Sequence, residues 1–347
     1  MTGAGRTAAI AELARYQPLR PPTRVDLSDN TSLWGPAPSV RGTLAALSDA
    51  QLSRYPTPYA DALCEAVAAR HGVDPARVVT GCGSDDVLDS AMRACCDTGS
   101  TIGVPVPTFS VIPTFAAVNE LAIARVPLRR DGALDVDGIL GTGADLYYVC
   151  APNNPTGTPA GLTQLRALLA GTDAVVLLDE AYADFADADA TGLLDAHPNL
   201  VVVRTLSKVF GIAGLRVGYA IGDVETIAAI TTSRGPYKVG GVAEAVATGA
   251  LREDRAWVDA RVAEVRSLRR WLADELRGAG LEVLDSQANF VAVLVEGAAA
   301  LRDRLLEADV LVRAYTALPV FGDLLRITIG PRPQLEEALA AIVGERR

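Results

Sequence analysis

The fold of this chain is decided by one stretch, Arg204-Thr-Leu-Ser-Lys-Val-Phe-Gly-Ile-Ala-Gly-Leu-Arg-Val-Gly218. Apolar runs precede and follow it, which predicts a loop between two buried strands. Within this loop, the hydroxyls of Thr205 and Ser207 and the guanidinium of Arg216 can bind a phosphate. The amine of Lys208 can condense with an aldehyde. The loop therefore suits a phosphorylated aldehyde, and we expect the cofactor pyridoxal 5′-phosphate.

A carboxylate upstream supplies the second half of this chemistry. Asp179 follows the apolar run 174–178, so it is expected at the end of a strand. Beside the pyridine nitrogen, a carboxylate keeps the ring protonated, and a protonated ring stabilises negative charge on the substrate. Tyr182 follows in the same turn and is expected to reach the phenolic oxygen of the cofactor. Glu180 is either an acid that supports this site or an exposed carboxylate.

A glycine-rich turn, Gly81-Cys-Gly-Ser-Asp-Asp86, follows a predicted strand and opens a predicted helix. Backbone N–H groups at such a helix start attract an anion. Gly83, Ser84 and Asp85 are therefore expected to line the phosphate site. The carboxylates of Asp85 and its neighbour are expected to point away from the phosphate. Cys82 is either a reactive thiol or a small apolar residue.

Two further turns follow predicted strands. In Ala151-Pro-Asn-Asn-Pro-Thr-Gly-Thr158, prolines and a glycine turn the chain at the carboxyl edge of a sheet, where open α/β folds bind ligands. Asn154 is expected to donate its amide to the phenolic oxygen, unless the asparagines only satisfy their own backbone. Phe109, which follows the run 101–104, is expected either to stack on the pyridine ring or to pack in the core.

Two arginines near the C-terminus are candidates for binding the substrate. Arg326 falls within the apolar run 324–329, and a buried guanidinium needs a partner. A substrate carboxylate would supply that partner, because the planar fork binds carboxylates through two hydrogen bonds. Arg313, in the run 310–315, is expected either to bind a second anionic group or to form a salt bridge.

The composition favours a soluble globular protein. The net charge of −10 disfavours nucleic acid and anionic membranes as partners, since both need a dense basic surface. The apolar runs have the length of strands, and the N-terminus lacks a central apolar stretch, so neither a membrane span nor a secretory signal is expected. The five cysteines and two histidines lack metal-ligand spacing, and no metal is expected. A cytoplasmic location is the default expectation.

The order of the apolar runs predicts an α/β fold with a second, smaller α+β domain. We expect an N-terminal arm over residues 1–24, packing with the small domain or a partner subunit. A large cofactor-binding domain is expected over 25–235 and a small C-terminal domain over 236–347. Strands are expected at 77–80, 101–104, 124–127, 145–149, 174–178, 200–204, 217–221, 290–295 and 324–329, and helices at 59–71, 84–96, 242–279, 298–308 and 333–343.

In this order the motifs resemble those of fold-type I aminotransferases, most closely the histidinol-phosphate aminotransferase branch. The similarity covers nearly the whole chain, in the segments 16–18, 34–36, 55–56, 83–85, 152–157, 179–182, 205–216, 311–313 and Arg326. It implies the fold type I architecture of pyridoxal-phosphate-dependent transferases, with a mostly parallel central sheet flanked by helices. Lys208 would then form the imine and move the proton, Asp179 would pair with the pyridinium, and Arg326 would bind the α-carboxylate.

The resemblance also implies roles for residues that the motifs alone do not explain. Tyr16 and Arg313 match positions that contact the substrate side chain and its phosphate. Tyr55 matches a residue that crosses from the partner subunit to the cofactor phosphate. The active sites would then be shared within a homodimer.

The implied reaction moves an amino group from histidinol phosphate to 2-oxoglutarate, a step of histidine biosynthesis. One segment departs from the family pattern, because Ser28-Asp-Asn-Thr-Ser-Leu-Trp34 stands where relatives carry a run like Asn-Glu-Asn-Pro near the substrate entrance. An aminotransferase of aromatic or specialised-metabolite amino acids is therefore an alternative. A decarboxylase similar to threonine-phosphate decarboxylases is another. A cofactor-binding regulator would need a DNA-binding domain that the short N-terminal arm cannot house.

Overall fold

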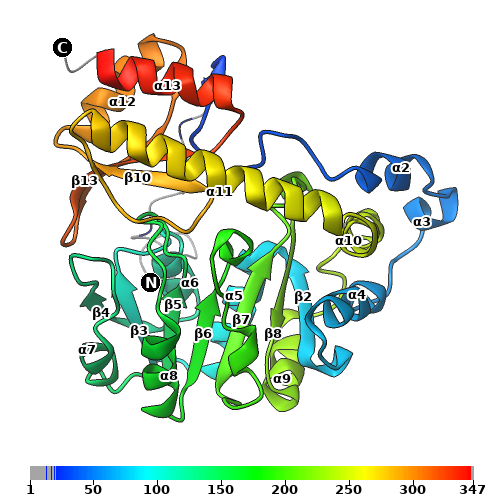
Figure 1. Cartoon of the computed structure of the whole chain (residues 1–347). Coiled ribbons are helices and arrows are strands. Elements are labelled where there is room, and N and C mark those ends of the chain that lie inside the picture. Colours follow the sequence, from blue (N-terminus) through cyan, green and yellow to red (C-terminus); the bar gives the residue numbers. More distant parts are fainter. Residues whose placement is uncertain (1–12, 14–16, 18, 20, 345–347) are drawn as a thin grey trace, which may run out of the picture.

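The computed structural model describes residues 13, 17, 19 and 21–344, so most of the expected arm, with Tyr16, lies outside the described residues. Its main sheet has the strand order β2-β8-β7-β6-β5-β3-β4 (Figure 1). Strand β8 runs antiparallel to both of its neighbours, and every other pair is parallel. The mostly parallel sheet is thus confirmed. Its strands are β2 (Val78–Cys82), β3 (Thr101–Val106), β4 (Ala122–Pro127), β5 (Leu146–Cys150), β6 (Val175–Asp179), β7 (Leu200–Thr205) and β8 (Val217–Ile221).

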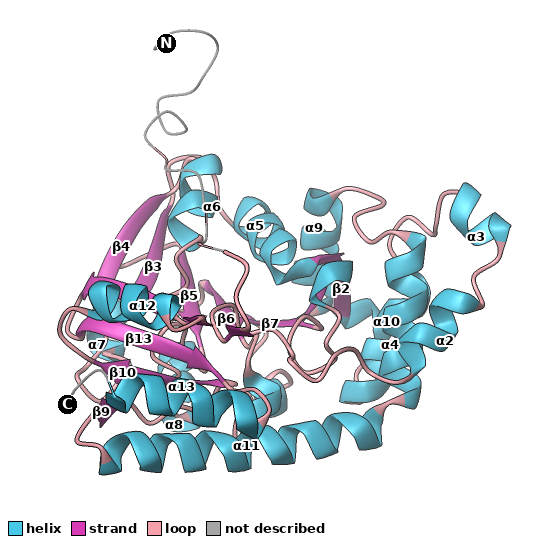
Figure 2. Ribbon diagram, turned by 90° about the horizontal axis from the view of Figure 1, so that it is seen from above, coloured by secondary structure: helices cyan, strands magenta, loops and turns pink. Residues whose placement is uncertain are grey.

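Helices cover both faces of this sheet (Figure 2). Side chains alternate between the faces, so Leu177 and Val201 belong to one buried cluster and Leu178 and Val202 to the other. Strands that are buried on both faces consist of continuous apolar runs, and these runs predicted the strands from the sequence. The helices that flank these strands in the sequence are α4 (Asp61–His71), α5 (Gly83–Cys95), α6 (Ile112–Val118), α7 (Val136–Leu140), α8 (Leu162–Ala170) and α9 (Val224–Arg234), with 3₁₀ turns at Pro75–Arg77, Ala183–Phe185, Thr191–Leu193 and Ala213–Leu215.

A second, antiparallel sheet has the strand order β12-β13-β10-β9. It comprises β9 (Glu282–Val283), β10 (Phe290–Leu294), β12 (Arg313–Leu318) and β13 (Gly322–Thr328), with α12 (Ala298–Glu307) and α13 (Arg332–Gly344) beside it. Strand β1 (Val25–Asp26) pairs with β11 (Val310–Leu311), so residues 25–26 lie with the C-terminal part of the chain rather than with the large sheet. The exact division into domains stays a prediction.

The expected long helix over 242–279 is wrong in one respect, because the structure has two helices there. They are α10 (Gly241–Glu253) and α11 (Arg255–Gly278), and they meet at Asp254. The buried Asp254 carboxylate accepts hydrogen bonds from the backbone N–H and the hydroxyl of Ser39. This contact ties the break to α2 (Ser39–Ala45), which is followed by α3 (Asp49–Ser53). Helix α10 therefore packs on α2 and α4, whereas α11 continues toward the small sheet (Figure 1).

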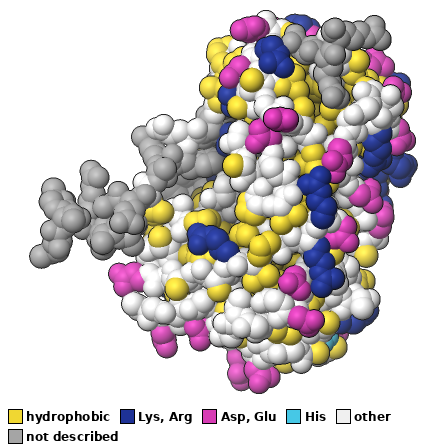
Figure 3. Space-filling view, turned by 90° about the vertical axis from the view of Figure 1, so that its left-hand side faces the viewer, with side chains coloured by type: hydrophobic (Ala, Val, Ile, Leu, Met, Phe, Trp, Pro, Cys, Tyr) yellow, Lys and Arg dark blue, Asp and Glu magenta, His cyan; other side chains and the backbone are white. Residues whose placement is uncertain are grey.

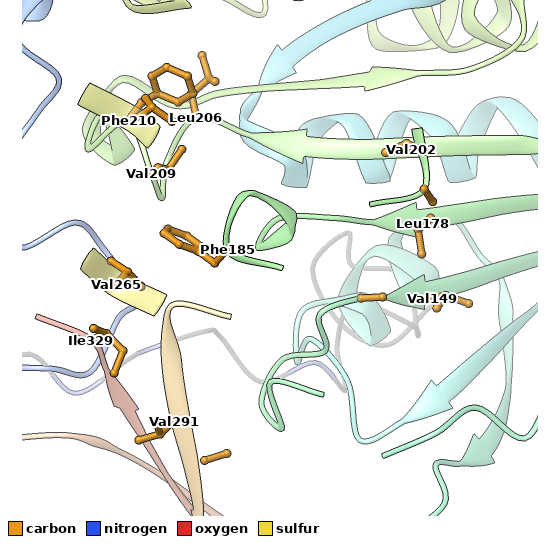
Figure 4. Close-up of a cluster of buried hydrophobic side chains, with 14 of the residues drawn as sticks. Val149, Leu178, Phe185, Val202, Leu206, Val209, Phe210, Val265, Val291 and Ile329 are labelled. Atoms are coloured by element: carbon orange, nitrogen blue, oxygen red, sulfur yellow. The ribbon is translucent and has the colours of Figure 1, made fainter. Parts of the chain in front are cut away.

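One apolar cluster connects the large sheet with the small one (Figure 4). Leu206, Val209 and Phe210, from the loop that carries Lys208, are almost fully buried in it. Burying each of these side chains stabilises the fold by about 1.5–3 kcal/mol. The loop is thereby held between the two sheets.

The surface shown in Figure 3 carries acidic and basic side chains interspersed with each other. Across the described residues, we find no helix that is both long and apolar enough to span a membrane. The same part of the chain contains no group of three or more His, Cys, Asp and Glu side chains suited to a metal ion.

Candidate active site

Five of the predicted site residues come from one edge of the large sheet. Asp179 ends β6, Asn154 follows β5, and Lys208 follows β7. The carboxyl ends of parallel strands meet at the same edge. Because β8 is antiparallel, Arg216 at its start lies at this edge too, and Gly83 follows β2, which runs parallel to β7.

The phosphate-binding candidates of the Lys208 loop contact one another. The Thr205 hydroxyl donates to Ser207 Oγ at 2.9 Å, and the Ser207 backbone N–H donates to Thr205 Oγ1 at 3.1 Å. Arg216 Nη1 donates to Ser207 Oγ at 3.4 Å. Two hydroxyls and a guanidinium therefore converge, as an oxyanion site requires.

Gly83 brings the N-terminus of α5 against this group. Its φ is +82°, and a Cβ there would collide with the Arg216 guanidinium. A Cβ at Gly218 would likewise collide with the backbone N–H of Ser84. Both glycines are thus required for the close approach of helix and loop, which leaves helix N–H groups beside the arginine.

Asp85 does not point away from the site as expected. Its Oδ2 accepts a hydrogen bond from Arg216 Nη2 at 3.0 Å. Asp86 instead binds the backbone N–H of Cys82 and the amine of Lys238, each at 2.9 Å. Cys82 is exposed rather than packed in the core, and a reactive role for its thiol stays a prediction.

Asp179 is a buried acid with two hydrogen-bond donors. Its Oδ2 accepts from the hydroxyl of Tyr148 at 2.9 Å, and its Oδ1 accepts from the backbone N–H of Ala181 at 3.1 Å. Burial raises the pKa of Asp179 to about 6 in spite of these donors. The sequence reading missed Tyr148, although a tyrosine inside the apolar run of the neighbouring strand was a usable signal.

Lys208 faces Tyr182, with Nζ 5.5 Å from the ring centroid. Burial, followed by the positive charge of Arg326, lowers the pKa of Lys208 to about 8. A neutral amine is therefore accessible near physiological pH, as a nucleophile requires. The Tyr182 ring packs edge-on against Phe290, and its hydroxyl accepts a hydrogen bond from Asn30 Nδ2 at 3.0 Å.

Arg326 is buried without an acidic partner. Nη1 donates to Asn154 Oδ1 at 2.7 Å, and Nη2 donates to the carbonyl of Ser28 at 2.6 Å. Its Nε is buried and has no hydrogen-bond partner. No carboxylate of the described chain forms an ion pair with this guanidinium. The contact with Asn154 Oδ1 leaves that residue's NH₂ group as a donor for another ligand.

Arg313 lies directly opposite Arg326 in the β12–β13 pair. Opposite residues of an antiparallel pair share one face, and like charges there are destabilising. The ring of Tyr315 lies 6.0 Å from the Arg313 guanidinium and 5.7 Å from that of Arg326. The salt bridge considered for Arg313 is not found within the part of the chain that the structure describes.

Glu180 is buried, so the exposed carboxylate considered for it is wrong. Its Oε2 accepts from Arg204 Nη2 at 2.6 Å and from Arg204 Nε at 3.0 Å. Its Oε1 accepts from the backbone N–H of Ala190 at 2.7 Å. Glu180 therefore anchors the turn that carries Asp179 and Tyr182.

Of the two remaining predicted residues, Phe109 follows β3 at the carboxyl edge of the sheet, whereas Tyr55 follows α3. Phe109 is half-buried and packs against the apolar cluster of the large sheet, and its stacking on a cofactor ring stays a prediction. Tyr55 is 85% exposed and follows α3 at the outer end of the molecule (Figure 1). Its ring contacts that of Tyr237, with centroids 5.0 Å apart.

The fold and this edge define a class of enzyme in which a half-buried lysine, a buried acid and an oxyanion site meet where parallel strands end. The chain belongs to the aminotransferase class I and II family, whose sequence model matches residues 22–342.

Curated relatives and solved structures agree with this assignment. A histidinol-phosphate aminotransferase of Syntrophus aciditrophicus is 35% identical over 90% of this chain and 89% of its own length. An aromatic amino acid aminotransferase of Rhodococcus erythropolis is 36% identical over 95% of this chain and 93% of its own. The structure of histidinol-phosphate aminotransferase from Sinorhizobium meliloti in complex with pyridoxal-5′-phosphate aligns over 100% of both chains, with a TM-score of 0.86 and 24% identity.

Proposed function

We propose that this chain is a pyridoxal 5′-phosphate-dependent aminotransferase that moves an amino group from histidinol phosphate to 2-oxoglutarate. The observation that carries the substrate assignment is the pair of facing arginines, Arg313 and Arg326, neither of which has an acidic partner among the described residues. Both proposed substrates are anions, since the donor carries a phosphate and the acceptor carries two carboxylates. Arg326 would bind the α-carboxylate of 2-oxoglutarate. Arg313 would bind the second carboxylate of this acceptor or the phosphate of the donor.

The residues at the sheet edge fit the cofactor. Its phosphate would bind the hydroxyls of Thr205 and Ser207, the Arg216 guanidinium and the N-terminus of α5, where the absence of a Cβ at Gly83 keeps the cradle open. When bound, the cofactor supplies an aldehyde that captures amino groups and a cationic ring that accepts negative charge. Asp179 would bind the proton on the ring nitrogen, which compensates the burial of its own charge.

Lys208 and its neighbours would move and direct the proton of the reaction. With its pKa lowered to about 8, Lys208 can take a proton from the substrate carbon and return it. Asn154 and Tyr182 would donate hydrogen bonds to the phenolic oxygen of the cofactor. Arg326 would fix the orientation of the substrate, which decides the bond that breaks. For the glutamate that 2-oxoglutarate becomes, this orientation would favour proton exchange at the α-carbon over decarboxylation.

An aromatic amino donor is the second candidate, favoured by the segment that departs from the family pattern. Thr31, Ser32 and Trp34 line a hollow that also contains Lys208. The Trp34 indole N–H donates to Glu264 at 3.2 Å, and the Arg261 guanidinium lies 5.5 Å from its ring centroid. The tryptophan therefore offers a fixed apolar wall near the reacting amine.

We further propose a cytoplasmic homodimer with shared active sites. Tyr55, Leu52 and Tyr237 are 85%, 60% and 46% exposed and come from neighbouring segments. Exposed aromatic and aliphatic groups of this kind mark protein interfaces. Tyr55 of one subunit would reach the phosphate site of the other. Sedimentation analysis of the wild-type protein and Tyr55→Phe, with cofactor affinity as the second readout, tests this proposal.

A panel of amino donors tests the reaction. The purified holoenzyme is supplied with 2-oxoglutarate and with either histidinol phosphate or phenylalanine, and the initial rates are compared. We expect the highest kcat/KM with histidinol phosphate and a loss of about 10³-fold or more in Lys208→Ala. A preference for phenylalanine would replace the donor and keep the class, whereas wild-type rates in Lys208→Ala would contradict both.

A further inference from the structure

Asn30 is a fully buried residue at the centre of a hydrogen-bond chain. Its backbone φ is +60°, a conformation that asparagine adopts more readily than most residues. The backbone N–H of Asn30 donates to Thr328 Oγ1 at 3.0 Å, and the Thr328 hydroxyl donates to Asn30 Oδ1 at 3.0 Å. Asn30 Nδ2 in turn donates to the hydroxyl oxygen of Tyr182 at 3.0 Å.

The chemistry of these groups fixes the direction of the chain. A backbone N–H can only donate, so the Thr328 oxygen accepts from it. The acceptor found for the single Thr328 proton among the described residues is the side chain of Asn30. The atom of Asn30 that accepts this proton must be Oδ1, which leaves the NH₂ group facing Tyr182. The Tyr182 oxygen then accepts, and its own proton is free for a different acceptor.

We infer that Asn30 and Thr328 are positioning residues that hold Tyr182 as a hydrogen-bond donor toward the cofactor's phenolic oxygen. This inference rests on the proposed function, because it concerns the same cofactor site. Without the amide donor, the Tyr182 hydroxyl could give its proton to a neighbouring protein oxygen. A phenol that accepts one hydrogen bond is also a stronger donor in the next one, since the bonds of a chain polarise each other.

The surroundings of Tyr182 agree with this role. Burial raises the pKa of its hydroxyl, while the positive charge of Arg326 and the hydrogen bond from Asn30 oppose that rise. The phenol therefore keeps its proton and can donate it. Cys150 and Tyr315 also raise the pKa of the Tyr182 hydroxyl and so favour its protonated form.

The chain also connects Tyr182 with the strand that would bind the substrate. Thr328 and Arg326 are two residues apart on β13, so their side chains share one face of the small sheet. A second contact holds Asn30 in place, because the Asn289 amide donates to its carbonyl at 3.0 Å. Strand β13 therefore positions both the arginine proposed to bind the substrate and, through Thr328 and Asn30, the hydroxyl of Tyr182.

Absorbance titration of the holoenzyme tests the inference. A donor to the phenolic oxygen stabilises its negative charge and lowers the pH at which the bound cofactor loses the proton of its Lys208 linkage. We expect Asn30→Gly, which keeps the left-handed backbone unstrained, to raise this midpoint by about 0.5–1 pH unit. Thr328→Val should raise it by less, and Thr328→Ser, which retains the hydroxyl, should leave it unchanged.

The Tyr182→Phe background separates positioning from a general structural effect. If Asn30 acts through the phenol, Asn30→Gly adds no further shift when Tyr182 is already phenylalanine. An equal shift in both backgrounds, or no shift in Asn30→Gly and Thr328→Val, would overturn the inference. A wild-type protein whose spectrum shows no lysine-bound cofactor would overturn the proposed function, and the inference with it.

Discussion

Arg204 and Arg326 are both arginines within apolar strands, and both are nearly inaccessible to solvent, at 5% and 6% exposure. Arg204 contacts two carboxylates, Glu180 at 2.6 Å and Asp189 at 3.1 Å. Arg326 contacts an amide and a carbonyl and leaves Nε without a partner. A buried charge that the protein neutralises serves the fold, whereas one that it leaves unneutralised is available to a ligand.

The electrostatic effects of the two arginines differ accordingly. Burial disfavours the charge of Arg204, yet Glu180 and its other partners raise the pKa of that guanidinium overall. The uncompensated charge of Arg326 acts outward and lowers the pKa of Lys208. The charge of Arg204 is thus balanced by carboxylates of the fold, whereas the charge of Arg326 lowers the pKa of the reacting amine.

The largest expected effect comes from breaking the neutralised pair. Glu180→Ala removes one partner and leaves Arg204 buried with less countercharge, so we expect a loss of about 3–5 kcal/mol in the free energy of unfolding. Urea denaturation of the apoprotein measures it. The matched control is the double variant Glu180→Leu/Arg204→Met, which removes both charges and should recover much of the loss. A single variant as stable as the wild type would contradict the structural role of the pair.

The sequence placed both arginines in strands, but it could not predict which groups of the protein each guanidinium contacts. The strands and the motifs that follow them are local, so the sequence predicted the sheet edge with Lys208, Asp179 and Asn154. The partners of a buried group are set by long-range packing. Asn30 and Thr328 lie at opposite ends of the chain, and no local pattern indicates that they meet.

The same reason explains the errors elsewhere in the fold. The break between α10 and α11 depends on Ser39, which contacts Asp254 across the molecule. The periodicity of the helix itself contains no trace of that contact. Strand β12 was missed because none of its side chains is fully buried, so its sequence lacks the continuous apolar run of the central strands.

The unneutralised arginine should show the opposite balance between stability and activity. Arg326→Leu removes a buried charge together with two hydrogen bonds, so we expect a change of about 1 kcal/mol or less in the free energy of unfolding. The value of kcat/KM should fall about 10²-fold, because charge-assisted bonds to an anionic substrate contribute about 1.5–3 kcal/mol.

Arg326→Lys is the control for charge alone, since lysine lacks the planar fork and should restore only part of the activity. The comparison requires both measurements on the same preparation. If Arg326→Leu destabilised the protein as much as Glu180→Ala, Arg326 would serve the stability of the fold as Arg204 does, and the proposed difference between them would be wrong.

The smallest expected effect is a shift in the titration of Lys208. Its pKa is lowered from 10.5 to about 8, first by burial and then by Arg326. Arg326→Gln removes the second cause and should raise the pKa by less than one unit, because burial remains. The rate at which pyridoxal phosphate binds the apoprotein measures the neutral amine, so its midpoint should move to higher pH. Asp85→Asn should move the midpoint the other way, because Asp85 raises the pKa of Lys208.

Stability provides an independent reading of the same shift. Between about pH 8 and 10.5 the unfolded chain holds a proton on Lys208 that the folded chain has lost, so the contribution of this group to stability rises with pH across that window. Raising the folded pKa narrows the window and reduces the rise. Arg326→Gln should therefore gain less stability than the wild type between these pH values, and an unchanged profile would show that Arg326 does not act on the lysine.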